Sequence, residues 1–396
     1  RGQLLLGESR AAHTCRLSLG SSGAWEVSAG SVGLVHDWLT GQRGGENVLV
    51  ELARLAPRAP IHTLFHFPGS VDPELETHPI QTSFLRHAPF LARRYRYYLP
   101  LFPTAMATLA TRRHALLLST SHCVAKGARS APGGRHVCYC HTPMRYVWDQ
   151  RRAYFPAPRG PSGWLRERVL NRLQRWDRST AGRVDLFLAN SRFVADRIQR
   201  YYGRDAPVVP PPVDTGFFRL SESPRERFVL MVAALAPYKK VDRAIQACAA
   251  SRIPLVIVGE GPERSRLAAL AGANVRFAGR VQRSELRELL STAMCYLQPG
   301  IEDFGIATVE ALACGTPVLA LGSGGVLDIV ENGLHGLLLA TDETGEIAAG
   351  IDKLRRMQFN PLDLRNRADE FSAERFRTRL KGHLRPFWPD TEEALV

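Results

Sequence analysis

Short apolar runs alternate with amphipathic segments along most of the chain, starting near Val32. In the first half these runs are VGLVHD, IHTLF, ALLLST, HVCYCHT and LFLANS; in the second half they are FVLMVAAL, PLVIVGEG, NVRFAGR, CYLQPG, TPVLAL and HGLLLA. Continuous apolar runs of this kind are typical of strands buried on both faces of a parallel sheet. The segments between them, such as VDRAIQACAAS and RSELRELLSTA, have the period of amphipathic helices. The pattern therefore predicts an α/β chain of two doubly wound domains.

A proline-rich stretch separates the two sets of runs. In VVPPPVDTGFF, residues 208–218, consecutive prolines exclude a continuing helix and stiffen the backbone, so we place the hinge there. We expect an irregular segment at 1–30, an N-terminal Rossmann-like domain at 31–213 and a C-terminal Rossmann-like domain at 214–370. The remainder, 371–396, contains the helical sequence FSAERFRTRLKGHL after the last predicted strand, so this helix is free to cross the cleft between the domains.

The charge of the chain favours an anionic partner. The formal net charge is +14 and the pI is about 9.9. Nucleic acid, phosphorylated metabolites and an acidic membrane surface would each satisfy this charge. Because the excess is almost all arginine and forms no tract, we expect no nucleic-acid partner.

Cysteine usage and hydropathy indicate the compartment. The 7 cysteines are scattered through apolar stretches, which is unlike a disulfide framework and is typical of a reducing cytosol. Cys138 and Cys140 share one face of a predicted strand, and we interpret them as two buried thiols because no second Cys or His pair lies nearby. No apolar run approaches the roughly 18 residues of a spanning helix, and the N-terminal residues lack a secretion signal. These features predict a cytoplasmic protein.

The stretch GIEDFGIATVEALACGTPVLA carries two carboxylates close to a predicted helix start. CYLQPG before it predicts a strand, IEDFG a turn, IATVEALACG a helix and TPVLAL the next strand. Glu302 would lie in the turn and Glu310 farther along the helix, so both can face one crevice. Backbone amides around Phe304, Gly305 and Ile306 would lie at the helix N-terminus, where an anion such as a diphosphate is stabilised. The alternative is a helix cap at Glu302 and a surface ion pair at Glu310.

Three further segments place glycine or polar residues at predicted strand ends. GQRGGE follows a strand and opens a helix, so amides at Gly44 and Gly45 can approach a phosphate or sugar, although glycine pairs also make simple turns. His141 ends the strand VCYCHT and would project into the cleft between the domains, or else fill a structural position. Lys239 in APYKK is a candidate cation for a diphosphate, with a solvated helix-start lysine as the alternative.

Two aromatic and basic segments are candidates for binding an acceptor. PMRYVWD offers Arg145, Tyr146 and Trp148 for stacking on a sugar and for hydrogen bonds to it. LRHAPFLARRYRYYLPLFP, residues 85–103, mixes arginines with tyrosines and fits the headgroup zone of a membrane, or equally a helix packed on the first domain.

Several of these motifs together resemble the retaining glycosyltransferases of family 4. The spacing from Glu302 to Glu310, followed by ALACGTPVLA, is similar to the signature of that family. The resemblance continues through HDWLTGQRGGENVL, CYCHTPMRYVWD, LAPYKKVDRAIQA, LVIVGEGPE, VRFAGRV and GSGGVLDIVENGLHGLLL. It extends from Val32 to about Leu384 and implies the GT-B architecture, in which two Rossmann-like domains face a cleft.

The resemblance implies roles for the carboxylates and for the helix start between them. Glu310 would accept hydrogen bonds from the ribose of the nucleotide. Glu302 would contact sugar hydroxyls near the reacting carbon and stabilise charge in the transition state. The backbone at Phe304, Gly305 and Ile306 would hold the distal phosphate or the sugar hydroxyls.

The remaining roles follow from the same resemblance. Lys239 would bind the diphosphate, and His141 would contact the donor sugar near its primary hydroxyl. The loop at Gly44 and Gly45 would close over the donor phosphate and part of the acceptor site. Backbone groups at Val281, in GRV, would contact the nucleobase without revealing which base it is.

The chain departs from the family pattern at one cationic position. Many relatives carry an arginine where this sequence has Ala234, so half of the usual cationic clamp is missing, and Arg43, Arg145 or Arg280 are candidates to replace it. No Asp-x-Asp motif is evident, so we expect no metal and no other cofactor. The resemblance implies retention of configuration, through attack by the acceptor on the same face that the phosphate leaves.

The resemblance is strongest to mannosyltransferases of polysaccharide and lipid-glycan assembly. GDP-mannose is therefore the first donor expected, and a glycan or lipid-linked sugar is the expected acceptor, with contact to the inner face of the membrane. A UDP-sugar-dependent transferase, a sugar-nucleotide epimerase and a catalytically degenerate nucleotide-sugar-binding protein are the alternatives.

Overall fold

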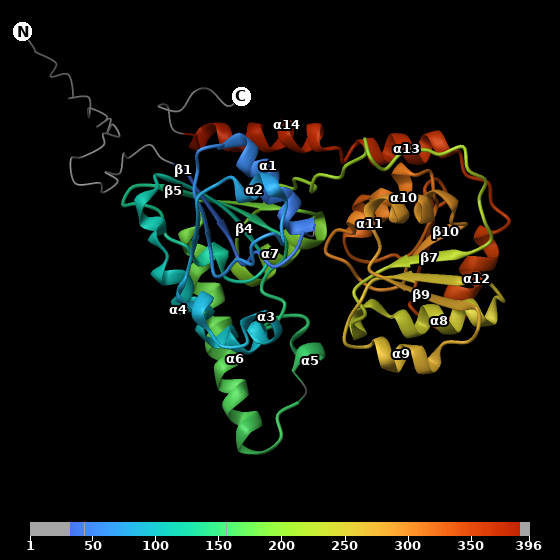
Figure 1. The fold of residues 1–396 in the computed structure, drawn as a ribbon, viewed down its shortest axis with the longest axis horizontal. Coiled ribbons are helices and arrows are strands. Elements are labelled where there is room, and N and C mark those ends of the chain that lie inside the picture. The colour runs from blue at the N-terminus through green and yellow to red at the C-terminus, as the bar shows by residue number, and fades with distance from the viewer. Residues whose placement is uncertain (1–31, 43, 156, 389–396) are drawn as a thin grey trace, which may run out of the picture.

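The computed structural model describes residues 32–42, 44–155 and 157–388. These residues form two α/β domains (Figure 1). The expected irregular segment 1–30, Arg43 and residues 389–396 lie outside the described residues.

The N-terminal domain is built on a six-stranded parallel sheet in the order β3-β2-β1-β4-β5-β6. Its strands are β1 (Val32–His36), β2 (Ile61–Thr63), β3 (Ile80–Thr82), β4 (Leu116–Ser121), β5 (Arg135–Cys140) and β6 (Leu186–Ala189). Its α-helices are α1 (Gly44–Leu55), α2 (Pro73–Glu76), α3 (Leu91–Arg94), α4 (Phe102–Thr108), α5 (Arg151–Tyr154), α6 (Gly160–Thr180) and α7 (Arg192–Tyr202). Short 3₁₀ turns lie at η1 (Phe84–His87), η2 (Tyr95–Leu101), η3 (Ala110–Arg113), η4 (Ala125–Gly127) and η5 (Ala181–Arg183).

The C-terminal domain has a second six-stranded parallel sheet, in the order β12-β11-β10-β7-β8-β9. Its strands are β7 (Val229–Val232), β8 (Leu255–Val258), β9 (Val275–Gly279), β10 (Cys295–Gln298), β11 (Val318–Leu321) and β12 (Gly336–Leu339). Its α-helices are α8 (Val241–Ala250), α9 (Arg264–Leu270), α10 (Arg283–Thr292), α11 (Ile306–Ala313), α12 (Thr344–Leu354) and α13 (Pro361–Asp369). The 3₁₀ turns η6 (Pro237–Lys239) and η7 (Gly325–Asp328) follow strands β7 and β11.

Consecutive apolar residues of a strand enter different hydrophobic clusters, which explains why the runs are mostly apolar and do not alternate with polar residues. In β4, Leu116 and Leu118 pack with α1, whereas Leu117 packs with α4 and α6. In β7, Leu230 packs with α11 and α13, whereas Met231 packs with α8 and α12. Both faces of each sheet are therefore covered by helices, as Figure 1 shows for α8 below the second sheet and α10 above it.

Two crossings connect the domains and run side by side. The linker 208–218 leads into the C-terminal domain, and the backbone N–H of Val213 donates to the carbonyl of Phe371, 2.9 Å away. Helix α14 (Ala373–Leu384) then returns to the first domain, where Phe376, Leu380 and Leu384 join the core that contains α1. The last turn is η8 (Arg385–Phe387).

The α/β fold class predicted from the sequence is confirmed. Each predicted apolar run contains a strand, and the helix predicted at IATVEALACG is α11. Strand β3 was not predicted because Ile-Gln-Thr is too short and too polar to stand out in the pattern, and it lies at the edge of its sheet. Within the described residues, no helix is both long enough and apolar enough to span a bilayer.

Candidate functional site

The turn between β10 and α11 brings Glu302 to the carboxyl edge of the second sheet, where ligands of α/β domains bind. The backbone carbonyl of Glu302 accepts a hydrogen bond from the N–H of Gly325 at 2.9 Å, so a neighbouring loop fixes this turn. Gly305 has φ 104°, a left-handed conformation that suits glycine, and it is the N-cap residue directly before α11. The Phe304 ring is buried against Phe371, so only its backbone is available to a ligand.

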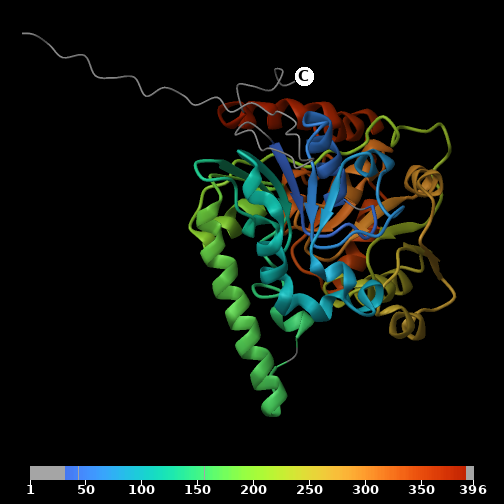
Figure 2. The ribbon, with the colours of Figure 1, turned by 60° about the vertical axis from the view of Figure 1, so that its left-hand side comes forward.

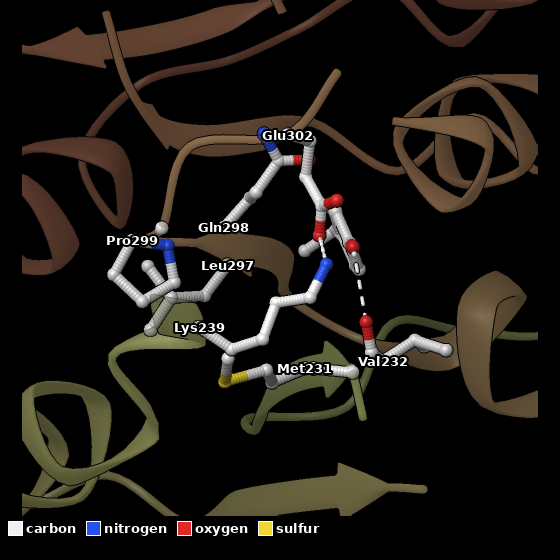
Figure 3. Close-up of a pocket in the computed structure, with 10 residues that line it drawn as sticks. Met231, Val232, Lys239, Leu297, Gln298, Pro299 and Glu302 are labelled. Atoms are coloured by element: carbon white, nitrogen blue, oxygen red, sulfur yellow. Dashed lines mark hydrogen bonds and ion pairs between the residues drawn. The ribbon is translucent and has the colours of Figure 1, made fainter. Parts of the chain in front are cut away.

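Lys239 extends from η6 to this turn and forms an ion pair with Glu302 (Figure 3). Burial alone would lower the pKa of Lys239, but the Glu302 carboxylate outweighs it and the pKa is raised, so the ammonium group stays charged. Beside the pair is a cavity whose volume of about 10 Å³ has room for about one water molecule. The pair therefore supplies a fixed cation at the mouth of the site and a carboxylate next to it.

Glu310 lies on α11, more than one turn beyond its first residue, and its side chain is partly exposed. Burial raises the pKa of its carboxyl to about 7, and the positive charge of Arg283 opposes this effect only in part. Val281 lies just before α10, partly buried against the same core as α11. The carboxyl group of Glu310, on α11, therefore loses its proton near neutral pH.

The first domain contributes the glycine pair and His141 to the same place. A Cβ atom on Gly44 would overlap Cδ1 of Ile306, so the start of α1 directly meets the start of α11 across the domain boundary. A Cβ atom on Gly45 would lie 3.5 Å from Nε2 of His141. Gly44, Gly45, His141 and Ile306, predicted from separate motifs, are therefore neighbours in space.

The imidazole ring of His141 is neutral, and its Nε2 atom makes no hydrogen bond to the described residues. Burial lowers the pKa of His141 well below its usual range, and the nearby His122 and His36 add to this effect. Its Nε2 atom is buried and has no hydrogen-bond partner among the described residues. A buried polar atom without a partner is costly, so a ligand hydroxyl at this position would satisfy it.

Asp303 links the two domains next to Glu302, and sequence reasoning did not identify it. Its carboxylate accepts hydrogen bonds from Arg145 at 3.0 Å and from Arg197 at 2.6 Å, and its carbonyl accepts one from the Ser191 hydroxyl at 2.5 Å. Arg145, Arg197 and Ser191 belong to the first domain. The only signal in the sequence is the position of Asp303 beside Glu302, which does not reveal its partners.

The three candidate acceptor residues have separate surroundings. Burial disfavours the charge of Arg145, but the Asp303 carboxylate outweighs it and raises the pKa of Arg145. Tyr146 packs edge-on against Tyr154, with ring centroids 4.8 Å apart. Trp148 donates to Asp177 at 2.8 Å and stacks on Tyr201, so its polar group is directed into the first domain and not toward Glu302.

A second group that the motifs did not reveal lies at the carboxyl edge of the first sheet. The buried Asp37 carboxylate accepts hydrogen bonds from four consecutive backbone N–H groups, those of residues 122–125. Its Oδ2 atom also lies 3.1 Å from Nδ1 of His122. This carboxylate fixes the loop after β4 beside His141, and its sequence signal is its place directly after the first apolar run.

Ala234, which stands where many relatives carry an arginine, is accessible to solvent. Ala234 is exposed in the loop after β7. Of the three candidate replacements, Arg145 is paired with Asp303, Arg280 is exposed after β9, and Arg43 lies outside the described residues. In the described part of the chain, no three His, Cys, Asp or Glu side chains are gathered closely enough to hold a metal ion.

Both halves of the chain match glycosyltransferase family models. Residues 42–217 match Glycosyltransferase Family 4, and residues 214–375 match Glycosyl transferases group 1. The D-inositol 3-phosphate glycosyltransferases of Mycobacterium tuberculosis and Mycobacterium bovis are 31% identical over 239 residues, which are 54% of this chain and 48% of theirs. The chain thus spans about half the length of these curated relatives.

Solved structures share the fold at low sequence identity. HepE from Anabaena, in a complex with UDP and glucose, is 19% identical, with a TM-score of 0.65 over 89% of this chain and 99% of that one. Sucrose-phosphate synthase from Thermosynechococcus elongatus is 16% identical, with a TM-score of 0.68 over 89% and 98% of the two chains.

Proposed function

We propose that this chain forms the two domains of a GT-B glycosyltransferase, because residues 42–217 match Glycosyltransferase Family 4 and residues 214–375 match Glycosyl transferases group 1. From this premise we propose that it transfers a sugar from a nucleotide-sugar donor to a hydroxyl group of a glycan or lipid-linked acceptor, with retention of configuration and without a metal. The observation that carries the proposal is that Gly44, next to Gly45 and His141 of the first domain, meets Ile306 at the start of α11, and the turn just before this helix carries Glu302, the partner of Lys239.

The second domain would bind the nucleotide diphosphate. The glycosidic bond breaks toward the phosphate, so negative charge grows on the leaving diphosphate. Lys239 and the N–H groups at the start of α11 would balance this charge, which a divalent ion balances in other transferases. Glu310 would accept from the ribose hydroxyls, and Glu302 would stabilise positive charge near the reacting carbon.

The first domain would hold the sugar and the acceptor. The unpartnered Nε2 of the neutral His141 ring would bond to a hydroxyl of the donor sugar. The backbone N–H groups of the glycine pair at the start of α1 would bind a phosphate or a sugar hydroxyl beside His141. The acceptor hydroxyl would attack from the face that the diphosphate leaves and pass its proton to the departing phosphate, so the configuration of the sugar carbon would be retained.

GDP-mannose is the first donor that we propose, because the motifs HDWLT, CHTPMRY and APYK together resemble mannosyltransferases. A UDP-sugar is the second candidate. It is supported by the relation of the fold to HepE, which was crystallised with UDP and glucose. The resemblance also supports a lipid-linked acceptor at the inner face of the membrane, to which the protein would bind peripherally from the cytoplasm.

A thermal-shift titration with GDP, UDP and ADP in the presence of EDTA tests the donor site. A ligand that binds only the folded state raises the melting temperature, because it adds about 2.7 kcal/mol of stability at a hundred times its Kd. We expect a rise with GDP and a smaller or no rise with the others; a rise with UDP alone would favour the second candidate. Failure of all three to raise the melting temperature would contradict an intact donor site.

Transfer itself needs a second assay. Incubation with GDP-mannose and a membrane lipid extract should give a mannosylated lipid whose new bond has the anomeric configuration of the donor, as measured by NMR. Nucleotide binding without any transfer from GDP- or UDP-sugars would indicate a catalytically degenerate binding protein. Loss of transfer in EDTA that Mg²⁺ restores would contradict the metal-independent mechanism.

A further inference from the structure

One guanidinium group lies between three segments of the chain that are far apart in sequence. Arg197 belongs to α7 of the first domain, and its side chain is only 8% exposed. Its Nη1 atom donates to the hydroxyl of Thr142 at 2.9 Å and to the carboxylate of Asp303 at 2.6 Å. Its Nη2 atom forms an ion pair with Asp149. This side chain therefore connects two segments of the first domain with a turn of the second.

Two of these segments carry the candidate residues for the donor sugar. Thr142 directly follows His141, whose Nε2 atom has no hydrogen-bond partner among the described residues. Asp303 directly follows Glu302, which pairs with Lys239. Because one nitrogen atom bonds to both of the following residues, it holds the separation between His141 and Glu302.

The third segment, which ends at Asp149, is held in place by α6. The ring nitrogen of Trp148 donates to the carboxylate of Asp177 at 2.8 Å. Asp177 is fully buried, and its carboxylate lies 3.0 Å from Nζ of the buried Lys126. It belongs to the end of α6 that packs on the first domain, whereas the other end of this helix projects away from the first sheet (Figures 1 and 2). The segment is therefore fixed on one side by α6 and on the other by α7.

Stability alone does not account for these buried charges. Arg197, Lys126 and Asp177 lose most of their contact with water, and apolar side chains in place of a buried ion pair are often neutral or stabilising. Guanidinium donors, in contrast, fix the direction and the distance of their acceptors. Arg145 donates to the other carboxylate oxygen of Asp303 at 3.0 Å, so this carboxylate is held at both of its oxygen atoms. Such an arrangement is suited to holding a geometry.

We propose that Arg197 is a positioning residue, which sets the separation of His141 and Glu302 so that the sugar of a nucleotide-sugar fits between them. The inference rests on the proposed function, because it takes these two residues as the sides of the sugar site. Arg197 itself touches neither the sugar nor the diphosphate. A lysine at this position would keep the positive charge, but its single nitrogen cannot hold Thr142, Asp303 and Asp149 in one plane.

Hydrogen–deuterium exchange of the ligand-free protein tests the separation directly. In Arg197→Lys, amide exchange should become about tenfold faster in two peptides at once, one that contains His141 and one that contains Glu302. Arg192→Lys is the matched control. Arg192 also lies on α7 and pairs across the domain boundary with Asp328, but its side chain is 71% exposed, so both peptides should exchange as in the unchanged chain.

Titration calorimetry then separates positioning of the sugar from binding of the nucleotide. The probes are GDP with GDP-mannose and UDP with UDP-glucose. Arg197→Lys should keep the affinity for the nucleoside diphosphate within about twofold and weaken that for the nucleotide-sugar about tenfold, because the second domain alone binds the diphosphate. The kcat for transfer should fall about a hundredfold, the cost of a misplacement of about 1 Å.

Thr142→Val is a second variant, because it removes the hydroxyl that accepts from Arg197 and leaves the ion pair with Asp303 in place. Exchange should then rise in the His141 peptide only. Each variant should show a single cooperative melting transition, which shows that it folds. Unchanged exchange in Arg197→Lys would overturn the proposal, as would an equal loss of affinity for the nucleoside diphosphate and the nucleotide-sugar. Failure of every nucleotide to bind the unchanged chain would contradict the proposed function, whereas faster exchange in both peptides would still support the positioning role of Arg197.

Discussion

The two domains share one strand order but differ in the side chains at the carboxyl edges of their sheets. When the strands of each domain are counted along the chain, the first sheet runs third, second, first, fourth, fifth, sixth, and the second sheet has the same order read from its other end. The edge of the first sheet presents His141, neutral because of its burial. The edge of the second presents the charged pair of Lys239 and Glu302 and the partly ionised Glu310. One topology thus supports two chemistries, because ligands meet the loops and not the strands.

Under the proposed function, each domain would have its own task. The leaving diphosphate would need compensating charge, which the second edge offers as an ammonium group and a helix N-terminus. The sugar would need neutral hydrogen-bonding groups, of which His141 at the first edge is one. Asp303 joins the two edges, since it follows Glu302 in the second domain and pairs with Arg145 and Arg197 of the first. Substitutions at Lys239, Asp303, Glu310 and Ala234 should change this difference in charge or the Asp303 contact between the domains, with effects that decrease in this order.

Lys239→Ala should have the largest effect, because it removes the fixed cation of the second edge. Transfer should fall by about 10²–10³, the scale measured when one preorganised electrostatic group is deleted. Nucleoside diphosphate binding, measured by isothermal titration calorimetry, should weaken as well. The matched control is Lys240→Ala, because Lys240 is more exposed (41% against 12%) and pairs with Asp342 instead. Equal losses in both variants would contradict a specific role for Lys239.

Asp303→Asn should loosen the contact between the domains by about 2 kcal/mol, because it leaves the part-buried guanidinium groups of Arg145 and Arg197 without this carboxylate. Small-angle X-ray scattering should show a larger radius of gyration for the variant. The difference from the unchanged chain should grow at low salt, where the ion pairs of the unchanged chain are least screened.

Another ion pair between the same domains provides the control for Asp303. Asp328 pairs with Arg192, whose side chain is 71% exposed, so Asp328→Asn should change the radius of gyration little. A variant at Asp303 that scatters like the unchanged protein would show that apolar packing alone holds the domains.

Glu310 should make the stability of the second domain depend on pH. Its pKa is about 7 in the folded chain and near 4.5 when unfolded, so the folded state binds more protons between these values. The contribution of this carboxyl group to the free energy of unfolding is therefore greatest below pH 4.5, and it is lost as the pH rises through 7. Because the side chain keeps some exposure, we expect a loss of about 1–2 kcal/mol, less than the full shift implies. Thermal melting of Glu310→Gln against the unchanged chain from pH 5 to 8 measures it.

The difference in melting temperature between Glu310→Gln and the unchanged chain should change with pH in one direction. The melting temperature of the Glu310→Gln variant should rise relative to the unchanged chain as the pH increases, since only the unchanged chain must bury a negative charge at this position. A constant difference across this range would contradict the raised pKa. Glu285→Gln is a suitable control, since Glu285 is exposed on α10.

The sequence predicted those features that depend on neighbouring residues. Apolar runs identified the strands because most positions of a strand buried on both faces are apolar, and glycines identified the turns at Gly44 and Gly305. The ion pairs of Asp303 could not be predicted, because Arg145 and Arg197 lie more than a hundred positions away in the chain. Such pairs depend on how the domains dock, which periodicity does not encode.

Trp148 is a residue that its motif singled out but whose partners the sequence did not reveal. Its neighbours in the motif suggested a sugar-stacking residue, and that role remains a prediction. Its ring nitrogen donates to Asp177, a buried carboxylate that also lies 3.0 Å from Nζ of Lys126 and accepts from Tyr202. A motif shows which side chains are close in sequence, but it does not show that one of them already donates a hydrogen bond to a buried carboxylate.

Ala234→Arg should have the smallest effect and acts in the opposite direction from the others. It adds a cation to the edge that already carries Lys239, at an exposed position in the loop after β7. A surface charge near a diphosphate contributes up to about 1 kcal/mol, so nucleoside diphosphate binding should tighten by about fivefold or less, and more at low salt.

The matched control is Ala273→Arg, at an exposed position just before β9. Because β9 is parallel to its neighbours, its beginning lies at the amino edge of the sheet, away from Glu302, so this arginine should leave binding unchanged in calorimetry. If Ala234→Arg fails to tighten binding while Lys239→Ala weakens it, then the second edge holds its diphosphate with one cation and the helix start, and the missing arginine is no deficit. If both arginine variants tighten binding equally, net charge and not the position of Ala234 is responsible.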